Sequence, residues 1–342
     1  MTMRWWRSQV LAWAVAFAML CPASAQTPSA AAYYQDKTIR MLLPTGPGGG
    51  RALYALPFAE AFSRHIPGNP RIVPIFMPGA GGSTAINNAQ NVAEPDGLTI
   101  VSPLKGSVIA QATNDPSVKY DLRNFNWIGR ITDATQIFFI SGKVPARTIE
   151  DLRTKEIIVG AVGRASVTYQ NPAFFNRVIG TKLKIVTGYR SAGATNMSVQ
   201  NGETQGAFTT WNDIQSYHMD LITDSKIRVL VQIALHRLPD LKHVPLLSDF
   251  AANEGDRELI DFMSSSSELG QTYAAPPGVP AYLVEALRRA FDATMKDPSY
   301  VDRLRKANIQ YNPMVGEELT QDVLRTLNAP RSLIERYQAA IN

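Results

Sequence analysis

The sequence is poor in the residues that build disulfides and metal sites. It contains one cysteine, Cys21, and four histidines in 342 residues. A single cysteine excludes an internal disulfide framework. The histidines are dispersed, and His236 and His243, which are closest in sequence, are too few ligands for a zinc site. We therefore expect no metal.

Recognisable catalytic motifs are also missing. The chain has no His-Glu-x-x-His metal helix, no phosphate loop ending in Gly-Lys-Ser/Thr and no Gly-x-Ser-x-Gly elbow. The glycines of Gly46–Gly50 miss the dinucleotide spacing, because Arg51 stands where a third glycine is needed. Ser166 and Thr168 have no histidine nearby in sequence. These absences disfavour an enzyme, and we expect no cofactor and no catalytic residue.

Charge of one sign is not concentrated anywhere. The chain has 34 Lys plus Arg against 29 Asp plus Glu, a formal net charge of +5, without a basic run. A nucleic-acid partner is therefore not expected. Hydrophobic residues make up 45% and charged residues 18%, which is typical of a globular protein, and the length is enough for two domains.

The first 25 residues have the pattern of a cleaved secretory signal peptide. Two arginines precede an uncharged apolar run over Val10–Leu20, and Ala23–Ala25 offers a small-x-small cleavage site. The run is about half the length of a membrane-spanning helix. A lipoprotein anchored at Cys21 is the alternative, but the preceding leucine fits a lipidation site poorly. We expect an exported, periplasmic protein.

The rest of the chain alternates short apolar runs with longer stretches of helical period. The runs predict strands at Ile39–Leu43, Ile72–Ile75, Leu98–Val101, Ile137–Ile140, Ile157–Gly160, Lys184–Val186 and Val229–Ile233. Helices are predicted over Leu53–Ile66 and Asn171–Ile179, from Pro280 to Met295, and around Ser299–Ala307 and Glu317–Leu327. This alternation predicts an α/β fold with mainly parallel sheets flanked by helices.

Four loops rich in glycine and hydroxyl residues each follow a predicted strand. They are Pro44–Arg51, Met77–Thr84, Gly160–Thr168 and Thr187–Ala194. Glycine lets the backbone approach a ligand, and a helix N-terminus presents free N–H groups to an anion. One such loop carries little information. Four at the carboxyl ends of parallel strands converge on one crevice and predict a carboxylate site.

A series of short motifs runs in order along nearly the whole mature chain. The motifs are Tyr34–Arg40 leading into Pro44–Gly50, then Pro78–Gly82, Pro95–Thr99, Tyr189–Ser191, Leu238–Pro245 and Ala275–Pro280. In these motifs the chain resembles the Bug-type periplasmic solute-binding receptors of tripartite tricarboxylate transporters. The resemblance implies two α/β lobes with a cleft between them, the first formed by residues 33–136 plus 272–342 and the second by residues 137–271.

The resemblance and the loop positions together indicate which residues contact a ligand. The expected ligand-binding residues are Thr45, Gly48, Gly49, Gly50, Arg51, Gly79, Ala80, Gly81, Ser102, Gly163, Ser166, Thr168, Tyr189, Arg190, Ser191 and Trp211. Arg51, Arg164 and Arg190 would give the cleft basic rims that suit an anion.

Two positions depart from the pattern of the family. Arg51 stands close to where the family usually has an acidic residue. At the head of a helix it can make a bidentate contact to a carboxylate, or it can face solvent, and the sequence leaves both open. Trp211 can stack on a ligand ring, but core packing is favoured.

The leading functional hypothesis is a monomeric periplasmic receptor. It would capture a small organic acid by lobe closure and deliver it to the integral-membrane permease subunits of a tripartite transporter. A binding subunit that feeds a membrane sensor uses the same kind of cleft and remains an alternative. A periplasmic enzyme acting on a carboxylate is disfavoured, because no nucleophile–base pair is apparent.

Overall fold

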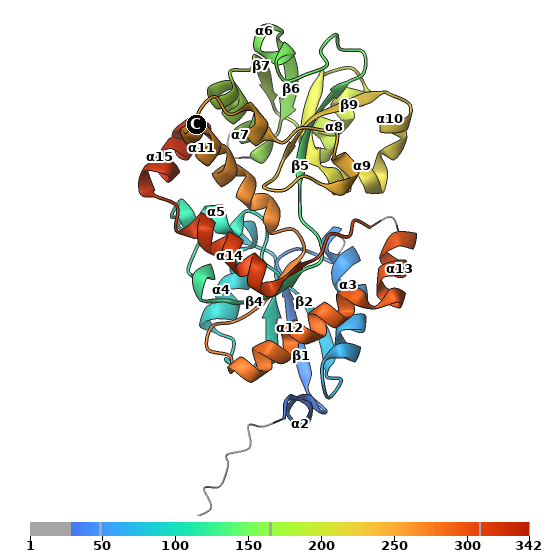
Figure 1. Ribbon diagram of the computed structural model, residues 1–342, viewed down its shortest axis with the longest axis vertical. Coiled ribbons are helices and arrows are strands. Elements are labelled where there is room, and N and C mark those ends of the chain that lie inside the picture. Colours follow the sequence, from blue (N-terminus) through green and yellow to red (C-terminus); the bar gives the residue numbers. More distant parts are fainter. Residues whose placement is uncertain (1–28, 48–49, 164–165, 308, 342) are drawn as a thin grey trace, which may run out of the picture.

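Two β-sheets, each flanked by helices, divide the molecule into two lobes along its long axis (Figure 1). The structure is a computed structural model and describes residues 29–47, 50–163, 166–307 and 309–341. Lobe 1 is built on the sheet that contains the first strand, and lobe 2 on the other sheet. The two-lobed α/β architecture expected from the sequence is confirmed.

The two sheets are mixed. In lobe 1 the strand order is β11-β4-β10-β3-β1-β2, with bounds Met314–Val315, Asn126–Arg130, Thr272–Ala275, Thr99–Val101, Thr38–Leu43 and Arg71–Phe76. In lobe 2 the order is β7-β6-β8-β5-β9, with bounds Leu183–Thr187, Ile157–Ala161, Gly206–Thr210, Gln136–Ser141 and Ile227–Ile233.

The sheets are not wholly parallel, because β5, β10 and β11 run against the direction of the other strands. β1 to β4 share one direction in lobe 1, and β6 to β9 share one direction in lobe 2, as the prediction of mainly parallel sheets requires. β5 and β10 run the opposite way, and so does the short edge strand β11. β5 and β10 are the strands through which the chain enters a lobe after crossing from the other one.

Helices cover both faces of each sheet. In lobe 1 they are α2 (Ala30–Tyr34), α3 (Gly50–His65), α4 (Ser83–Asn91), α5 (Ser107–Ala112), α12 (Ala281–Lys296), α13 (Pro298–Lys306) and α14 (Gly316–Leu327). In lobe 2 they are α6 (Asp151–Thr154), α7 (Val167–Phe174), α8 (Ala192–Gln200), α9 (Trp211–Tyr217), α10 (Met219–Thr223), α11 (Glu254–Ser264) and α15 (Arg331–Ile341). Short helical turns lie at Ala80–Gly82, Leu122–Asn124, Phe175–Ile179, Pro239–Leu241, Leu247–Phe250 and Ser265–Glu268.

The alternating side chains of each central strand pack into two hydrophobic cores, one on each face of the sheet. In β1, Met41 packs in the core beneath α3 and α12, whereas Leu42 packs on the opposite face with α4 and α14. In β5, Phe138 and Phe139 divide in the same way between the two faces of the lobe 2 sheet. Successive strand residues point to opposite faces, so an apolar run such as this one becomes a strand buried on both sides.

The chain passes between the lobes three times. The first two passages, residues 131–135 and 269–271, lie side by side and are called the crossing segments, and the third, residues 328–330, leads from α14 to α15. The Ile131 N–H donates to the Gln271 carbonyl at 2.9 Å, and the Gln271 N–H donates to the Thr132 carbonyl at 2.9 Å. A Cβ at Gly270 would lie 2.2 Å from the Thr132 carbonyl oxygen. The crossing segments therefore approach so closely that this position admits only glycine.

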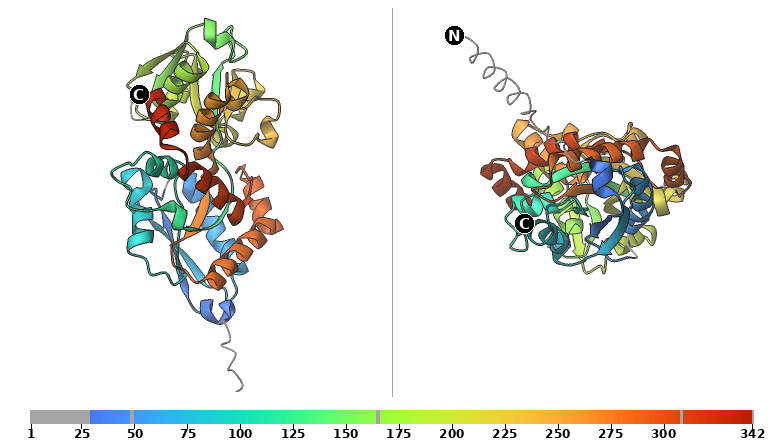
Figure 2. Two further views of the ribbon diagram at one scale, coloured as in Figure 1. Left: turned by 60° about the vertical axis from the view of Figure 1, so that its left-hand side comes forward. Right: turned by 90° about the horizontal axis from the view of Figure 1, so that it is seen from below.

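The last helix belongs to lobe 2, which corrects the prediction that all of residues 272–342 belong to the first lobe. Tyr337 and Ala340 of α15 are buried in the lobe 2 core, and the Tyr337 ring contacts those of Phe174 and Phe262. Figure 2 shows this C-terminal helix beside lobe 2, after α14 at the junction. The apolar face of α15 decides its place, because it finds its matching core on α7 and α11.

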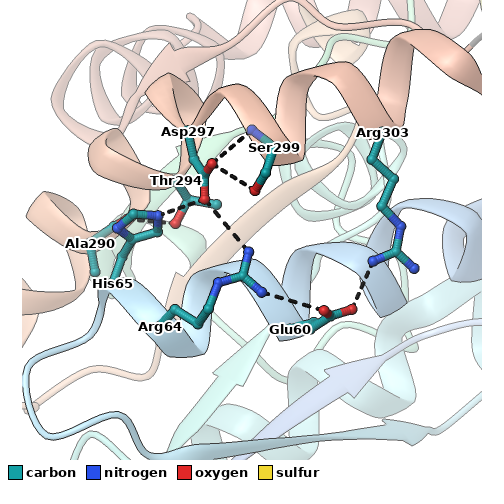
Figure 3. A network of polar contacts seen from close by, with 8 residues as sticks. All are labelled: Glu60, Arg64, His65, Ala290, Thr294, Asp297, Ser299 and Arg303. Carbon is teal, nitrogen blue, oxygen red and sulfur yellow. Dashed lines mark hydrogen bonds and ion pairs between the residues drawn. The ribbon is translucent and has the colours of Figure 1, made fainter.

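A network of charged side chains ties α3 to the C-terminal helices on the surface of lobe 1 (Figure 3). The Asp297 carboxylate lies 3.1 Å from His65 Nε2 and 3.6 Å from Arg64 Nη2. Glu60 pairs with Arg64 at 3.4 Å and with Arg303 at 2.7 Å. Exposed pairs of this kind contribute at most about 1 kcal/mol each, so the network adds little to the stability of the fold. Its carboxylates pair with its own cationic side chains, and these contacts hold α13 against α3.

No helix within the described ranges is both long enough and apolar enough to span a bilayer.

Candidate functional site

The carboxyl ends of the co-directional strands face one another where the lobes meet. β4 ends at Arg130, where the chain crosses to lobe 2, and β1, β2 and β3 run in the direction of β4. β8 ends at Thr210, opposite the first residue of β5, and β6 and β7 run parallel to β8. The loops after these strands therefore lie on the facing ends of the two lobes, where α/β proteins bind ligands.

A cavity of about 310 Å³ lies at this junction, and we call it the interlobe cavity. It is lined by Thr45, Arg51, Leu53, Tyr54, Leu104, Lys105 and Ile309 of lobe 1, by Asp133, Ala134, Leu269, Gly270 and Gln271 at the crossing, and by Thr210, Asn212 and Asp213 of lobe 2. A larger cavity of about 890 Å³ lies within lobe 2, beside β9. The interlobe cavity is the candidate site, because both lobes and the crossing segments contribute to it.

Arg51, in the first turn of α3, lines the interlobe cavity and is only 8% exposed. Its Nη1 donates to Ser102 Oγ, and its Nη2 donates to the Gly270 carbonyl oxygen at 2.9 Å. Burial lowers the pKa of the Arg51 guanidinium to about 10, so the group is still charged at neutral pH. Among the described residues, no acidic side chain forms an ion pair with Arg51.

Lys105 is a second cation in the interlobe cavity, and the sequence motifs do not single it out. It is partly buried in the loop between β3 and α5. Burial lowers the pKa of its ammonium to about 8, and the negative charge of Asp213 on lobe 2 counteracts this shift. The signal that could have found Lys105 is positional, because its loop follows a predicted strand just as the four glycine-rich loops do.

Three polar atoms of the cavity lining are buried without a hydrogen-bond partner among the described residues. They are Thr45 Oγ1, Asn212 Oδ1 and Gln271 Oε1. Buried polar atoms are normally paired, so each of these can accept a hydrogen bond from a polar ligand or from water. The other atom of the Asn212 amide, Nδ2, donates to the Tyr54 hydroxyl at 3.3 Å and joins lobe 2 to lobe 1.

The Asp133 carboxylate also lines the cavity, but its hydrogen bonds are made. Its Oδ1 accepts from the Thr135 N–H at 2.9 Å and from the Thr135 hydroxyl at 2.7 Å. Its Oδ2 accepts from Asn312 Nδ2 at 2.5 Å. Asp133 therefore fixes the crossing segment to the C-terminal part of lobe 1.

The structure brings some of the predicted site residues together at the interlobe cavity. Thr45 and Arg51 line it, and Ser102 holds the Arg51 guanidinium while donating its own hydroxyl to the Thr272 carbonyl at 2.7 Å. The sequence leaves open whether Arg51 contacts a carboxylate or faces solvent. Arg51 does not face solvent, and part of its guanidinium is bonded to the Gly270 carbonyl of the crossing segment.

The glycine-rich loop after β2 lies on the facing end of lobe 1, outside the lining of the interlobe cavity. Gly79, Ala80 and Gly81 are exposed there. Ala80 has a φ of 44°, in the left-handed region that residues with a side chain rarely adopt.

In the loop after β6, hydroxyl groups bond within the loop itself. Ser166 Oγ donates to the Gly163 carbonyl at 2.6 Å and lies 2.7 Å from Thr168 Oγ1. Thr168 Oγ1 accepts from the Val162 N–H at 3.0 Å. These hydroxyls shape the turn, and the three predicted residues of this loop do not line the interlobe cavity.

The loop after β7 also stays on lobe 2. The Tyr189 ring lies against Gly160, where an added Cβ would be 2.8 Å from it. Ser191 Oγ accepts from the Ala194 N–H at 3.1 Å and caps α8, while Arg190 is exposed. The predicted residues of this loop lie on the facing end of lobe 2 but outside the interlobe cavity lining.

Trp211 does not reach the interlobe cavity. Its backbone N–H donates to the Thr135 carbonyl at 2.9 Å, but its side chain is 4% exposed and packs in a lobe 2 core with Ile137 and Leu241. The indole is buried with those side chains, which is the core packing favoured from the sequence, so Trp211 is not among the residues that line the interlobe cavity.

Several predicted positions lie outside the described residues. These are the signal segment 1–25, Gly48, Gly49 and Arg164. Gly50 is described as the first residue of α3, directly before Arg51.

The described residues offer no set of metal ligands, since nowhere among them do three His, Cys, Asp or Glu side chains gather as a metal ion needs.

The fold and the interlobe cavity define the chain as a two-lobed periplasmic binding protein. Residues 62–338 match the model of the tripartite tricarboxylate transporter family receptor, TctC. The chain therefore belongs to this family, and the resemblance found in its motifs is confirmed. The family is one of solute-binding receptors, and membership implies a periplasmic location.

Solved structures of such receptors are similar to the whole described fold. A TctC solute-binding protein from Polaromonas, without ligand, is 19% identical with a TM-score of 0.69, covering 90% of this chain and 99% of that one. MatC from Rhodopseudomonas palustris, with bound malate, is 18% identical with a TM-score of 0.57, covering 90% and 99%. A further Rhodopseudomonas palustris protein, with adipate, is 17% identical with a TM-score of 0.58, covering 89% and 97%. These identities establish the fold alone. A comparison with curated proteins gives no match.

Proposed function

We propose that the protein is a periplasmic receptor that captures a small organic acid in the interlobe cavity and delivers it to the membrane permease of a tripartite transporter. The observation that carries this proposal is the buried Arg51 guanidinium, which lines the cavity without an acidic partner among the described residues. Burying an uncompensated charge is costly, and a bound carboxylate relieves that cost.

The hydrogen-bonding capacity of Arg51 supports direct contact with the acid. A guanidinium has five N–H donors, and the bonds to Ser102 and Gly270 use two of them. The remaining donors can bind a carboxylate with charge-assisted hydrogen bonds. The unpaired Thr45 hydroxyl lies in the same lining and can add a further polar contact.

Lobe closure is the proposed means of capture. The lining combines groups of both lobes with residues of the crossing segments. A ligand that contacts both lobes binds the closed conformation more tightly than the open one. It therefore shifts the population toward closure by as much as its affinities for the two conformations differ. We propose that the receptor acts as a monomer, carries out no chemical step, and is exported after cleavage of residues 1–25.

The comparisons support this proposal at the level of the ligand class. MatC binds malate and the related Rhodopseudomonas palustris protein binds adipate, and both share the fold of this chain. The family description names a tripartite transporter as the context of the receptor.

A thermal-shift screen of the mature protein against organic acids tests the proposal. A ligand that binds only the folded state stabilises it by about 2.7 kcal/mol at a concentration 100 times its Kd, so a matching acid raises the melting temperature by several degrees. Ligand co-purified with the protein is removed first by unfolding and refolding. If no acid in a broad library shifts the transition, or if an acid is chemically converted, the proposal fails.

A further inference from the structure

The charges of the interlobe cavity are divided between the lobes. Lobe 1 contributes two cations, Arg51 from α3 and Lys105 from the loop after β3. Lobe 2 contributes an anion, Asp213, and the unpaired acceptor Asn212 Oδ1, both from the first turn of α9. A ligand held between the lobes therefore meets positive charge on one side and negative charge with a hydrogen-bond acceptor on the other.

One of the two cations in the lining has no acidic partner among the described residues. Asp213 acts on the charge of Lys105 across the cavity, and Asp133 is bonded to Thr135 and Asn312. Arg51 has no acidic partner among the described residues. Arg51 therefore offers a position for one ligand carboxylate, whereas a second carboxylate would meet the acidic side chains of Asp213 and Asp133 in the same lining.

Part of the lining is apolar. Its members are Leu53, Leu104, Ala134, Leu269 and Ile309, together with the ring of Tyr54. These side chains can bury the body of a ligand that is larger and less polar than a short-chain dicarboxylate.

We infer that the receptor selects an acid with a single carboxylate on an apolar body, whose far end is uncharged or donates a hydrogen bond. Arg51 binds the carboxylate, and Asp213 is the residue that rejects a second one. This inference rests on the proposed function, because it names the class of acid that the same cavity takes.

A series of matched acids tests the inference with the unmodified protein. Hexanoate, 6-hydroxyhexanoate and adipate share one carbon chain and differ at the far end alone, and the same comparison is made at the chain length of the best-binding acid. We expect the hydroxy acid to bind at least about tenfold more tightly than the dicarboxylate, measured by isothermal titration calorimetry. A dicarboxylate that binds as tightly as the hydroxy acid, or more tightly, overturns the inference and leaves the proposed function standing. A complete lack of binding by every acid contradicts the proposed function itself.

The substitution Asp213→Asn tests the source of the selectivity. In the native protein the Thr209 hydroxyl donates a hydrogen bond to Asp213 Oδ2 at 2.8 Å. Asparagine keeps an oxygen that can accept this bond but removes the negative charge. Lys105 is then free for a second carboxylate, so the affinity for adipate rises by about tenfold and that for 6-hydroxyhexanoate stays within about threefold. Asp240→Asn, an exposed change on the same lobe outside the interlobe cavity, is the matched control. If Asp213→Asn leaves the ratio of the two affinities unchanged, Asp213 does not set the selectivity.

Discussion

At the scale of single residues, Arg51 joins two roles in one side chain. Its guanidinium bonds to the Gly270 carbonyl, 219 positions away in the sequence, and it lines the cavity where an anion is proposed to bind. The sequence indicates an arginine beside a carboxylate loop, but the partner that buries it comes from the other end of the chain. Such a long-range contact leaves no local pattern, and for that reason the burial of Arg51 could not be predicted.

The substitution Arg51→Ala weakens binding of the cognate acid by about 1.5–3 kcal/mol, the usual size of a charge-assisted hydrogen bond. Its effect on the stability of the ligand-free protein is smaller, because relief of the buried charge offsets the lost bonds to Ser102 and Gly270. Calorimetric titration and chemical unfolding measure the two quantities. Arg303→Ala, an exposed arginine of lobe 1 (Figure 3), is the control that leaves binding unchanged. An unaltered affinity of Arg51→Ala would assign Arg51 to the crossing alone.

We expect Lys105 to make the affinity for the acid dependent on pH. The charged groups that line the cavity with it are Arg51 from α3, Asp213 from α9 and Asp133 from the crossing segment. Burial lowers the pKa of Lys105 to about 8, so below pH 8 its charge is present and balances that of Asp213. Above pH 8 the ammonium loses its proton, the negative charge of Asp213 is unopposed, and the affinity for an anion falls.

Titrations on either side of pH 8 check this dependence. Lys105→Arg keeps a positive charge over the same range, because an arginine stays protonated, and it should abolish the fall. If the native protein and Lys105→Arg respond to pH in the same way, Lys105 is not the responsible group.

At the scale of elements, the strands that follow from the sequence are those that carry a short run of apolar and β-branched residues, namely β1, β2, β3, β5, β6, β7 and β9. Their residue patterns predict them directly. The patterns miss the two-residue strand β11, and they also miss β4, β8 and β10, which include glycine, threonine or charged residues. These strands are stabilised by pairing with neighbours that lie far away in the sequence, as in Gly206 of β8 opposite Ile140 of β5. Their formation is a tertiary effect that local propensity does not record.

We expect the stability of the protein to be sensitive to any substitution of Gly270 in the second crossing segment. A methyl group there would meet the Thr132 carbonyl oxygen at 2.2 Å, so Gly270→Ala forces the two segments apart and displaces the carbonyl that Arg51 binds. We expect a loss of about 1–3 kcal/mol in the free energy of unfolding together with weaker acid binding, measured by urea unfolding and calorimetry. Gly193→Ala in α8, where the nearest atom to an added Cβ is 3.7 Å away, should be neutral or stabilising. Equal stability of the two variants would show that the crossing tolerates a side chain.

At the scale of the whole molecule, the two lobes follow from the sequence, but the path of the chain between them does so only in part. The alternation of strands and helices predicts the α/β lobes, and four glycine-rich loops mark their facing ends. The return of α15 to lobe 2 is not apparent from the sequence, because an apolar helix face does not by itself say which core it will join, and the core that buries α15 is formed by residues far away in the chain. The candidate site was likewise predicted in part, since the strand-end rule identifies the loops while the side chains that enter the cavity depend on how the lobes meet.

The central claim is that an acid bound between the lobes draws them together, and an interlobe distance tests it most directly. Cys21 lies in the predicted signal segment, so a mature protein with Thr84→Cys in lobe 1 and Val186→Cys in lobe 2 carries spin labels at two exposed positions only. The account predicts that the distance between the labels shortens as the acid is added, saturates with the binding isotherm, and shortens only at correspondingly higher acid concentrations when Arg51→Ala is also present. A distance that does not change while calorimetry shows the acid fully bound would contradict it.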